Sequence, residues 1–246
     1  MNSANDGVAI PAAGRRGPRG FLIFAVSGIG GLIALGTWQL DRLDQKETLI
    51  ADRQAMLVQP PLDFNGLTDI PDKIAYRRAT VTGEFSHEKE LRIGPRTRRG
   101  RAGWQVVTPF RRGTGGIILV DRGWVPDSLK NPQSRPNGQV TGIVTLTGFM
   151  MSVIARGRFV PDNDAAKGDW YWIDPATMAV HLELSNVAPY WLVAARDPSR
   201  SVGPVGVDRG AMPVNNHLQY AITWYALAAL LSVLAFVYWR RASSDD

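Results

Sequence analysis

The chain has 246 residues and a formal net charge of +6, with 45% hydrophobic and 20% charged residues. It contains no cysteine, which excludes disulfides, a cysteine nucleophile and any zinc or copper site built on thiolates. Its length suits one sizeable domain or two small ones.

Two long stretches without a charged residue lie near the ends of the chain, at 21–40 and 218–239. A helix of ~20 apolar residues crosses the ~30 Å hydrocarbon layer of a bilayer, so we predict two transmembrane helices. Two alternatives stay open, a buried core helix and, for the first stretch, a cleaved signal peptide. That stretch is longer than the usual signal core of ~7–15 residues, which favours an uncleaved anchor.

Basic residues flank both stretches on their terminal sides, with Arg15, Arg16 and Arg19 before the first, and Arg240 and Arg241 after the second. Short basic flanks stay in the cytoplasm, so both termini are predicted to be cytoplasmic. Arginine outnumbers lysine, which favours a bacterial cytoplasmic membrane over a mitochondrial inner membrane. The predicted organisation is a tail (1–19), a first span (20–40), an outer domain (41–217), a second span (218–239) and a tail (240–246).

The first helix is predicted to continue beyond the membrane. Leu43, Ile50 and Leu57 recur at sevenfold spacing among charged residues, which is typical of an amphipathic helix. The pair Pro60-Pro61 is expected to end it.

From Tyr76 onward, apolar residues recur every second position instead of with the helical period, in short segments separated by Gly and Pro. This pattern predicts strands and turns. We expect a membrane protein whose two transmembrane α-helices flank an outer α+β domain dominated by an antiparallel sheet or small barrel. The expected elements are a hairpin (79–85 with 90–94), a second hairpin (103–110 with 116–124), strands at 139–150, 171–174 and 189–196, and a helix from Pro175 capped by Asp174.

Small residues offer a packing face on each span, because small side chains let helices approach closely in lipid. We expect Ser27 and Gly31 of the first span to pack against Ala228, Ser232 and Ala235 of the second.

No enzyme motif is present, neither GxSxG nor a Walker loop nor HExxH, so we predict that the protein is not an enzyme. His87 and His181 each stand alone. His87, beside Glu88 and Glu90, belongs either to a site or to a solvated turn, and the turn is the favoured interpretation; His181 is interpreted as helix surface. The arginines at 96, 98, 99 and 101 allow three interpretations. They form a solvated hairpin tip, or they contact anionic lipid, or they pair with carboxylates of a bound ligand. Nucleic acid is not an expected partner of a domain outside the membrane.

The third histidine, His217, stands where a polar segment becomes apolar. In a helix it shares a face with Tyr220, Ala221 and Trp224, which are 3, 4 and 7 residues away. That arrangement suits the edge of a flat haem, with His217 as iron ligand and Tyr220 and Trp224 as apolar contacts. The alternative is an aromatic belt with a polar terminator, which is common at membrane interfaces.

Five ordered segments of the chain resemble the surfeit locus protein 1 family. They read LGTWQLDRLDQK (35–46), YRRATVTGEFSHEKELRIGPR (76–96), GWQVVTPF (103–110), GIILVDRGWVP (116–126) and NNHLQYAITWYALA (215–228). The family-motif positions are Trp38, Gln39, Arg42, Tyr76, Arg77, Gly83, Arg122, Gly123, Trp124 and Pro126, and the histidine of the family's second span falls on His217. Arg78 departs from the pattern, since the family commonly has Pro there.

The resemblance implies a chaperone-like assembly factor for haem–copper cytochrome c oxidase of the respiratory chain. It implies partners in the oxidase catalytic subunit, other assembly factors and the lipid bilayer. Haem a is the implied cofactor, with His217 as its ligand. Two other functions stay open at this point, a cofactor-free scaffold for oxidase intermediates and a membrane-anchored envelope enzyme.

Overall fold

The computed structural model describes residues 18–65, 74–113, 115–153, 157–197, 203–206 and 213–243. The chain forms two compact units, which are taken one at a time below. The first comprises residues up to Leu49 and from Val214 onward, and the second comprises Ile50–Pro213. The predicted N-terminal tail up to residue 17, with Arg15 and Arg16, lies outside the described residues.

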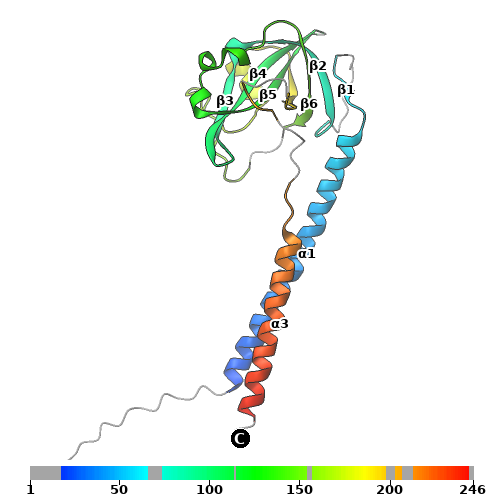
Figure 1. Ribbon diagram of the computed structural model, residues 1–246, viewed down its shortest axis with the longest axis vertical. Coiled ribbons are helices and arrows are strands. Elements are labelled where there is room, and N and C mark those ends of the chain that lie inside the picture. The colour runs from blue at the N-terminus through cyan, green and yellow to red at the C-terminus, as the bar shows by residue number, and fades with distance from the viewer. Residues whose placement is uncertain are drawn as a thin grey trace, which may run out of the picture. The chain divides into compact units, whose positions relative to one another are not determined.

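The first helix, α1, spans Pro18–Val58 (Figure 1). At ~1.5 Å per residue it is ~60 Å long, about twice the thickness of a hydrocarbon layer. The predicted continuation beyond residue 40 is therefore confirmed, and the helix ends before Pro60-Pro61 as expected. Leu43, Ile50 and Leu57 are all partly buried, in agreement with the predicted face.

The last helix, α3, spans His217–Ala242 and lies antiparallel to the first part of α1 (Figure 1). The tilted rings of Phe21 and Tyr238 pack with their centroids 4.3 Å apart, while Thr37 Oγ1 lies 3.1 Å from the Tyr225 hydroxyl. A Cβ on Gly36 would stand 2.8 Å from the Tyr225 ring. Because Gly36 has no side chain, the Tyr225 ring can pack directly against α1.

The packing faces of the two helices were predicted only in part. Ala228 and Ala235 are buried, and with Ala221 they form a sevenfold series along α3, the period of coiled-coil-like packing. The prediction of Ser27 and Gly31 on α1 is wrong, as is that of Ser232 on α3, because all three are exposed. The buried small positions of α1 are instead Ala25 and Gly36, and the partly buried Gly28 approaches Leu231.

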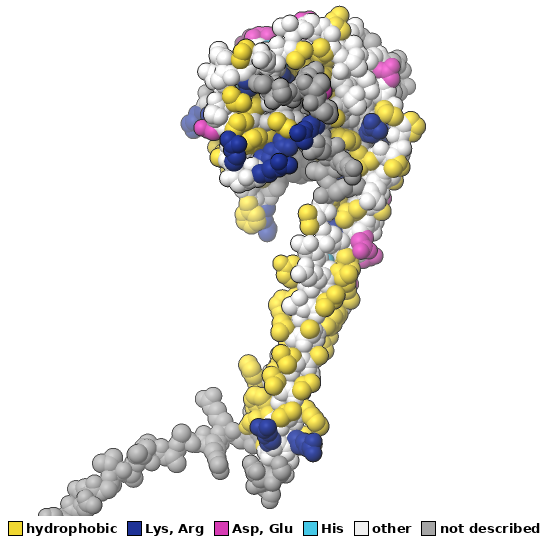
Figure 2. Space-filling model, viewed as in Figure 1, with side chains coloured by type: hydrophobic (Ala, Val, Ile, Leu, Met, Phe, Trp, Pro, Cys, Tyr) yellow, Lys and Arg dark blue, Asp and Glu magenta, His cyan; other side chains and the backbone are white. Residues whose placement is uncertain are grey.

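Both helices are long and apolar enough to cross a membrane. Large apolar side chains stay exposed along them, among them Ile23 at 69% and Phe24 at 75% (Figure 2). Leaving such side chains in water would cost ~1.5–3 kcal/mol each. This exposure disfavours the core helix of a soluble protein and is what a lipid-facing surface requires.

In the described part of the second unit, seven strands and several short helices follow the end of α1. Hydrogen-bonded neighbours in the sheet follow the order β1-β2-β6-β7-β5-β4-β3. Strand β2 also pairs with β4, and this pairing closes β2, β6, β7, β5 and β4 into a small barrel (Figure 1). The predicted barrel is thereby confirmed. The strands are β1 (Leu62–Asp63), β2 (Arg78–Phe85), β3 (Leu91–Arg98), β4 (Arg101–Arg112), β5 (Ile117–Pro126), β6 (Val144–Ser152) and β7 (Val187–Ala194), and the short helices are η1 (His87–Lys89), η2 (Asp127–Leu129), η3 (Pro132–Ser134), η4 (Pro136–Gly138) and α2 (Pro175–His181).

The hairpin predicted between β2 and β3 is wrong, whereas the one between β4 and β5 is confirmed. Both β2 and β3 pair antiparallel with β4, β2 near Phe110 and β3 between Arg101 and Val107. They consequently run in the same direction, and η1 joins them without reversing the chain. One long strand thus takes two partners in succession along the same edge.

Gly83 marks the corner where β2 leaves β6 and joins β4, since it pairs with both Val144 and Arg112. A Cβ there would lie 2.0 Å from the carbonyl oxygen of Arg111. This family-motif glycine is therefore required by the close approach of two backbones at barrel closure. Arg78, the departure from the family pattern, begins β2 and pairs with Phe149.

Two apolar cores stabilise the unit. One fills the barrel around Phe64, Phe110 and Met150, and the other lies between Trp170, Met178 of α2 and Trp191. Asp174 caps α2 as predicted, accepting a hydrogen bond from Thr177 N.

Two of the predicted strands need correction. The strand at 171–174 is wrong: this segment has no regular structure, and an isolated bridge between Trp170 and Ile93 directly precedes it. The strand at 139–150 begins only at Val144, whereas the strand at 189–196 is confirmed as β7.

Candidate functional site

His217 is the first residue of α3, and its ring lies between the two helices of the first unit. Its Nδ1 is 2.7 Å from Oε1 of Gln39, which α1 supplies from a position 178 residues earlier. Its backbone N–H donates to Oδ1 of Asn215 at 3.3 Å. Within the described part of the chain, Nε2 makes no hydrogen bond. The structure thus joins two family-motif positions that are far apart in sequence.

The two aromatic residues predicted to contact a cofactor lie differently. Trp224 is partly buried two turns below His217, on the side that also carries the buried Ala221. Its Nε1 is buried and has no hydrogen-bond partner among the described residues. Tyr220, by contrast, is 55% exposed. The four residues therefore do not form one continuous covered face, and Tyr220 stands on its outer margin.

This donor set fits a haem iron ligand in its chemistry. A neutral imidazole binds iron through one nitrogen while the other donates a hydrogen bond to a protein group, and His217 has that second contact. The unsatisfied Trp224 Nε1 offers a donor on the same side. When bound, haem would supply the iron, and His217 would hold it through an imidazole nitrogen. No three His, Asp or Glu side chains converge on a common point within the residues described.

The other motif residues of the first unit, Trp38 and Arg42, lie on α1 near Gln39. Trp38 is 50% exposed, and the Arg42 guanidinium carbon lies 5.8 Å from the centroid of its ring. Arg42 also donates to Gln45 Oε1 at 2.9 Å. Such a pair is typical of an aromatic and basic anchor at a membrane interface.

Tyr76 and Arg77 connect the entry to the barrel with the end of α1. The guanidinium of Arg53 lies 4.3 Å from the centroid of the Tyr76 ring, and Arg77 Nη2 donates to the carbonyl of Pro60 at 3.1 Å. Tyr76 adopts a φ of 67°, which costs energy for a residue other than glycine. These contacts fix the turn by which the chain enters β2.

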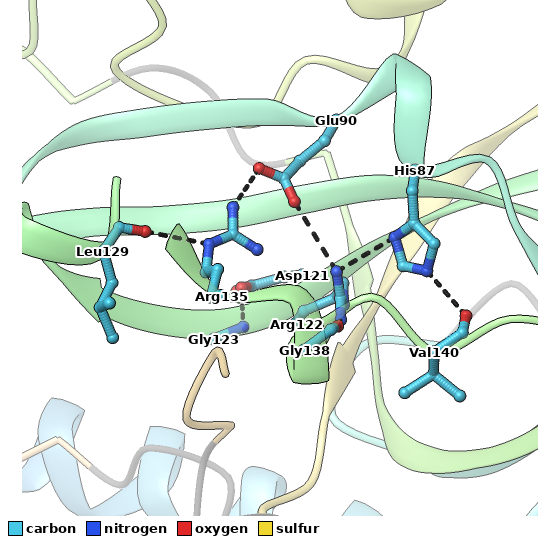
Figure 3. A network of polar contacts seen from close by, with 9 residues as sticks. All are labelled: His87, Glu90, Asp121, Arg122, Gly123, Leu129, Arg135, Gly138 and Val140. Atoms are coloured by element: carbon cyan, nitrogen blue, oxygen red, sulfur yellow. Dashed lines mark hydrogen bonds and ion pairs between the residues drawn. The ribbon is translucent and has the colours of Figure 1, made fainter. Parts of the chain in front are cut away.

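A buried polar network surrounds the motif residue Arg122 (Figure 3). Its Nη2 donates to the carbonyl of Gly138, and its Nη1 lies 3.7 Å from Glu90 Oε2 and 3.4 Å from His87 Nδ1. Its guanidinium carbon lies 4.8 Å from the centroid of the Phe85 ring. Arg122 therefore joins η1, β5 and the end of η4 at one point.

A second arginine completes the network, and sequence reasoning missed it. Arg135 is fully buried; it forms an ion pair with Glu90 Oε1 and donates from Nε to the carbonyl of Leu129 at 3.0 Å (Figure 3). The side chain of Glu90 is only 2% exposed and faces both guanidinium groups. One carboxylate thus balances two buried cations. No sequence signal pairs a residue of the 127–138 segment with η1.

His87 belongs to this network, so its interpretation as part of a solvated turn is wrong. Its Nε2 lies 2.7 Å from the carbonyl of Val140, and its ring stacks on Phe85. Because the carbonyl can only accept, Nε2 carries the proton and Nδ1 is free to accept from Arg122. Burial lowers the pKa of His87, and the charge of Arg122 lowers it further against the opposing Val140 hydrogen bond. The ring is therefore held neutral.

Asp121 lies beside Arg122 on β5 and is almost fully buried. Its Oδ1 accepts from the backbone N–H of Gly123 at 3.0 Å, and its Oδ2 accepts from Gln105 Nε2. Burial raises the pKa of Asp121 from 3.8 to about 6, although these two hydrogen bonds and the charge of Arg96 lower it in part. The ionised carboxylate is thus a cost to folding near neutral pH.

We expect Asp121→Asn to change the pH dependence of stability. Between pH 3.8 and about 6 the folded protein binds more protons at Asp121 than the unfolded chain does. The contribution of Asp121 to the free energy of unfolding therefore falls as pH rises through this window. Asparagine does not titrate, so from pH 4 to pH 7 the variant should gain about 2 kcal/mol relative to wild type. Urea unfolding of both proteins at the two pH values measures this, and a constant difference would contradict it.

The rest of the β5 motif binds the segment 203–206. Trp124 and Val205 exchange two backbone hydrogen bonds, of 3.1 and 2.9 Å. Gly123 has a φ of 108°, and a Cβ there would stand 2.1 Å from the carbonyl oxygen of Val205. Pro126 ends β5 opposite Gly103. Glycine at 123 is therefore required twice, by its φ and by the close approach of segment 203–206.

A cavity of about 460 Å³ opens beside the network. Phe85, Val140, Leu146 and Pro204 supply apolar walls, and Arg122 supplies a buried guanidinium. The volume is in the range of small-molecule pockets. Arg122 thus serves both the internal network and the wall of this cavity.

The arginine-rich loop is the tip of the β3–β4 hairpin, and its arginines divide into two groups. Arg96 donates to the carbonyl of Tyr171, and Arg98 donates to that of Val205 at 3.3 Å. Arg99 and Arg101 are exposed, in line with a solvated tip. His181 is exposed at the end of α2, as predicted, and its ring meets Trp170 edge-on.

Comparison with known proteins gives a consistent result over most of the chain. The model of the SURF1 family matches residues 27–229. The chain is 37% identical over 253 residues to the SURF1-like protein of Monosiga brevicollis, covering 96% of this chain and 94% of that protein. It is 37% identical to Surfeit locus protein 1 of Xenopus tropicalis over 217 residues (82% and 70%) and 34% identical to that of Homo sapiens over 218 residues (82% and 72%).

Proposed function

Because this chain belongs to the SURF1 family, we propose that it is a membrane assembly factor for haem–copper cytochrome c oxidase. At the level of the family, membership implies a role in oxidase assembly and association with oxidase subunits. The two apolar helices agree with a place in the membrane. The finer part of the proposal is that the chain holds haem a through His217 during maturation of the catalytic subunit.

The observation that carries the haem proposal is the setting of His217. The ring is partly buried between two apolar helices, Gln39 engages Nδ1 at 2.7 Å, and Nε2 makes no hydrogen bond to any described residue. An imidazole placed only as a polar terminator would be expected to turn toward water. Trp224 Nε1 is also buried and finds no hydrogen-bond partner among the described residues, which leaves a donor available to a bound group.

In this proposal the barrel is the part that meets the oxidase subunits. Its polar network holds η1, β5 and the 127–138 segment together, so the surface built on them is rigid. We place the protein in a bacterial cytoplasmic membrane with both termini inside. The support for this orientation is the basic flank of each span, including Arg240 and Arg241 in the last turn of α3.

The oxidase role can be tested in a bacterial strain whose own family member has been deleted. Expression of this chain is expected to restore cytochrome c oxidase activity and the haem a absorbance of washed membranes toward the parental level. An empty vector should restore neither. A chain that is present in the membrane fraction, yet leaves oxidase activity at the level of the empty vector, would contradict the proposal.

A further inference from the structure

The contact between Gln39 and His217 determines more than the position of the ring. An amide oxygen can only accept a hydrogen bond, so a contact from Gln39 Oε1 places the proton of a neutral His217 on Nδ1. The other nitrogen, Nε2, then carries a lone pair. Which imidazole nitrogen can bind a metal is set by the hydrogen bond that the other nitrogen makes.

We propose that Gln39 is a positioning residue for the haem site: it holds His217 in the Nδ1–H tautomer and presents the Nε2 lone pair to iron. The proposal rests on the haem function proposed above. Partners of this kind orient metal-binding histidines in many proteins, and their loss typically weakens binding by about 10–100-fold. It gives the glutamine of the Trp38-Gln39 motif a chemical role.

The helix pair holds Gln39 in place independently of His217. One turn earlier on α1, Gly36 makes room for the Tyr225 ring, and Thr37 Oγ1 lies 3.1 Å from the Tyr225 hydroxyl. These contacts fix the register of α1 against α3, because the tyrosine stands only eight residues after His217. The acceptor atom, Oε1 of Gln39, is therefore held at a defined position opposite the imidazole of His217.

The tautomer can be measured on the full chain in detergent micelles, without haem. The protein has three histidines, so selective ¹⁵N labelling gives few imidazole signals, and His217→Ala identifies those of interest. At a pH where the ring is neutral, wild type should show the Nδ1–H tautomer. Gln39→Leu should shift His217 toward Nε2–H, whereas Gln39→Glu keeps an acceptor and should preserve Nδ1–H. The matched control is Gln45→Leu, an exposed glutamine on the same helix, which should change nothing.

Haem retention supplies the second readout. Gln39→Leu should lose haem at least about tenfold faster than wild type, and Gln39→Glu should remain near wild type. An Nε2–H tautomer in wild type would overturn the inference, and so would a Gln39→Leu variant with unchanged tautomer and haem loss. If wild type shows Nδ1–H but never holds haem, the proposed function fails, while the orientation of His217 by Gln39 stands.

Discussion

Replacing Glu90 with alanine is expected to lower the free energy of unfolding of the barrel unit by about 3–5 kcal/mol. Glu90 is the carboxylate that faces the buried guanidinium groups of both Arg122 and Arg135. Arg135 is fully buried; its Nη2 contacts Glu90, and its Nη1 has no hydrogen-bond partner among the described residues. Removing Glu90 therefore leaves uncompensated positive charge in the interior, which costs far more than a lost surface contact.

The effect can be measured by urea unfolding of the detergent-solubilised chain, followed by tryptophan fluorescence. The matched control is Glu88→Ala, two residues away on η1 and exposed, which should shift the free energy of unfolding by less than about 0.5 kcal/mol. If both variants unfold at the urea concentration of wild type, the network does not stabilise the unit.

A double variant separates the orphaned charge from simple loss of packing. In Glu90→Leu with Arg135→Met, apolar groups replace a carboxylate and one of its two cations. Because a buried ion pair can be exchanged for apolar side chains at small cost, the double variant should be more stable than Glu90→Ala alone. A double variant that is less stable than Glu90→Ala would show that packing, and not charge, dominates.

The elements dictated by local pattern were predictable from the sequence. Two uncharged stretches predicted the apolar helices, and the sevenfold series through Leu43 and Ile50 predicted the continuation of α1. The β4–β5 hairpin and the Asp174 cap of α2 also follow from short-range signals. In each case the information lies within a few residues of the element.

Strand partnership was not predictable in the same way. The false β2–β3 hairpin arose because consecutive strands usually pair, whereas β4 is long enough to pair with both. The parallel pair of β5 with β7 joins strands separated by β6 and α2. The predicted strand at 171–174 is wrong because this short segment only connects the buried Trp170 to α2 and pairs with no strand among the described residues. These outcomes depend on tertiary packing, which no local period encodes.

The candidate site divides along the same line. Residue type and helical spacing pointed to His217 and Trp224, and the family resemblance pointed to Gln39 and Arg122. Only the three-dimensional structure reveals that Gln39 contacts His217 across 178 residues and that Glu90 forms an ion pair with Arg135. Tyr220 was grouped with His217 by a spacing of three residues, but the neighbouring helix α1 covers the other side.

The second large effect is expected for His217→Ala. If the Nε2 of His217 binds haem iron, the substitution removes the axial bond itself, and the Soret band of the purified protein should be lost or shifted. Removing one imidazole at the N-terminus of α3 should leave the chain in the membrane. Trp224→Ala and Tyr220→Ala should weaken haem retention less, because each removes packing and not the bond. His181→Ala, an exposed histidine on α2, is the matched control and should leave the spectrum unchanged.

The most direct measurement is therefore the visible spectrum of the detergent-purified chain from cells that make haem a. The account predicts a haem spectrum for wild type and for His181→Ala, and its loss or displacement for His217→Ala. A wild-type protein that never carries haem, or a His217→Ala variant with the wild-type spectrum, would contradict it and favour a cofactor-free scaffold.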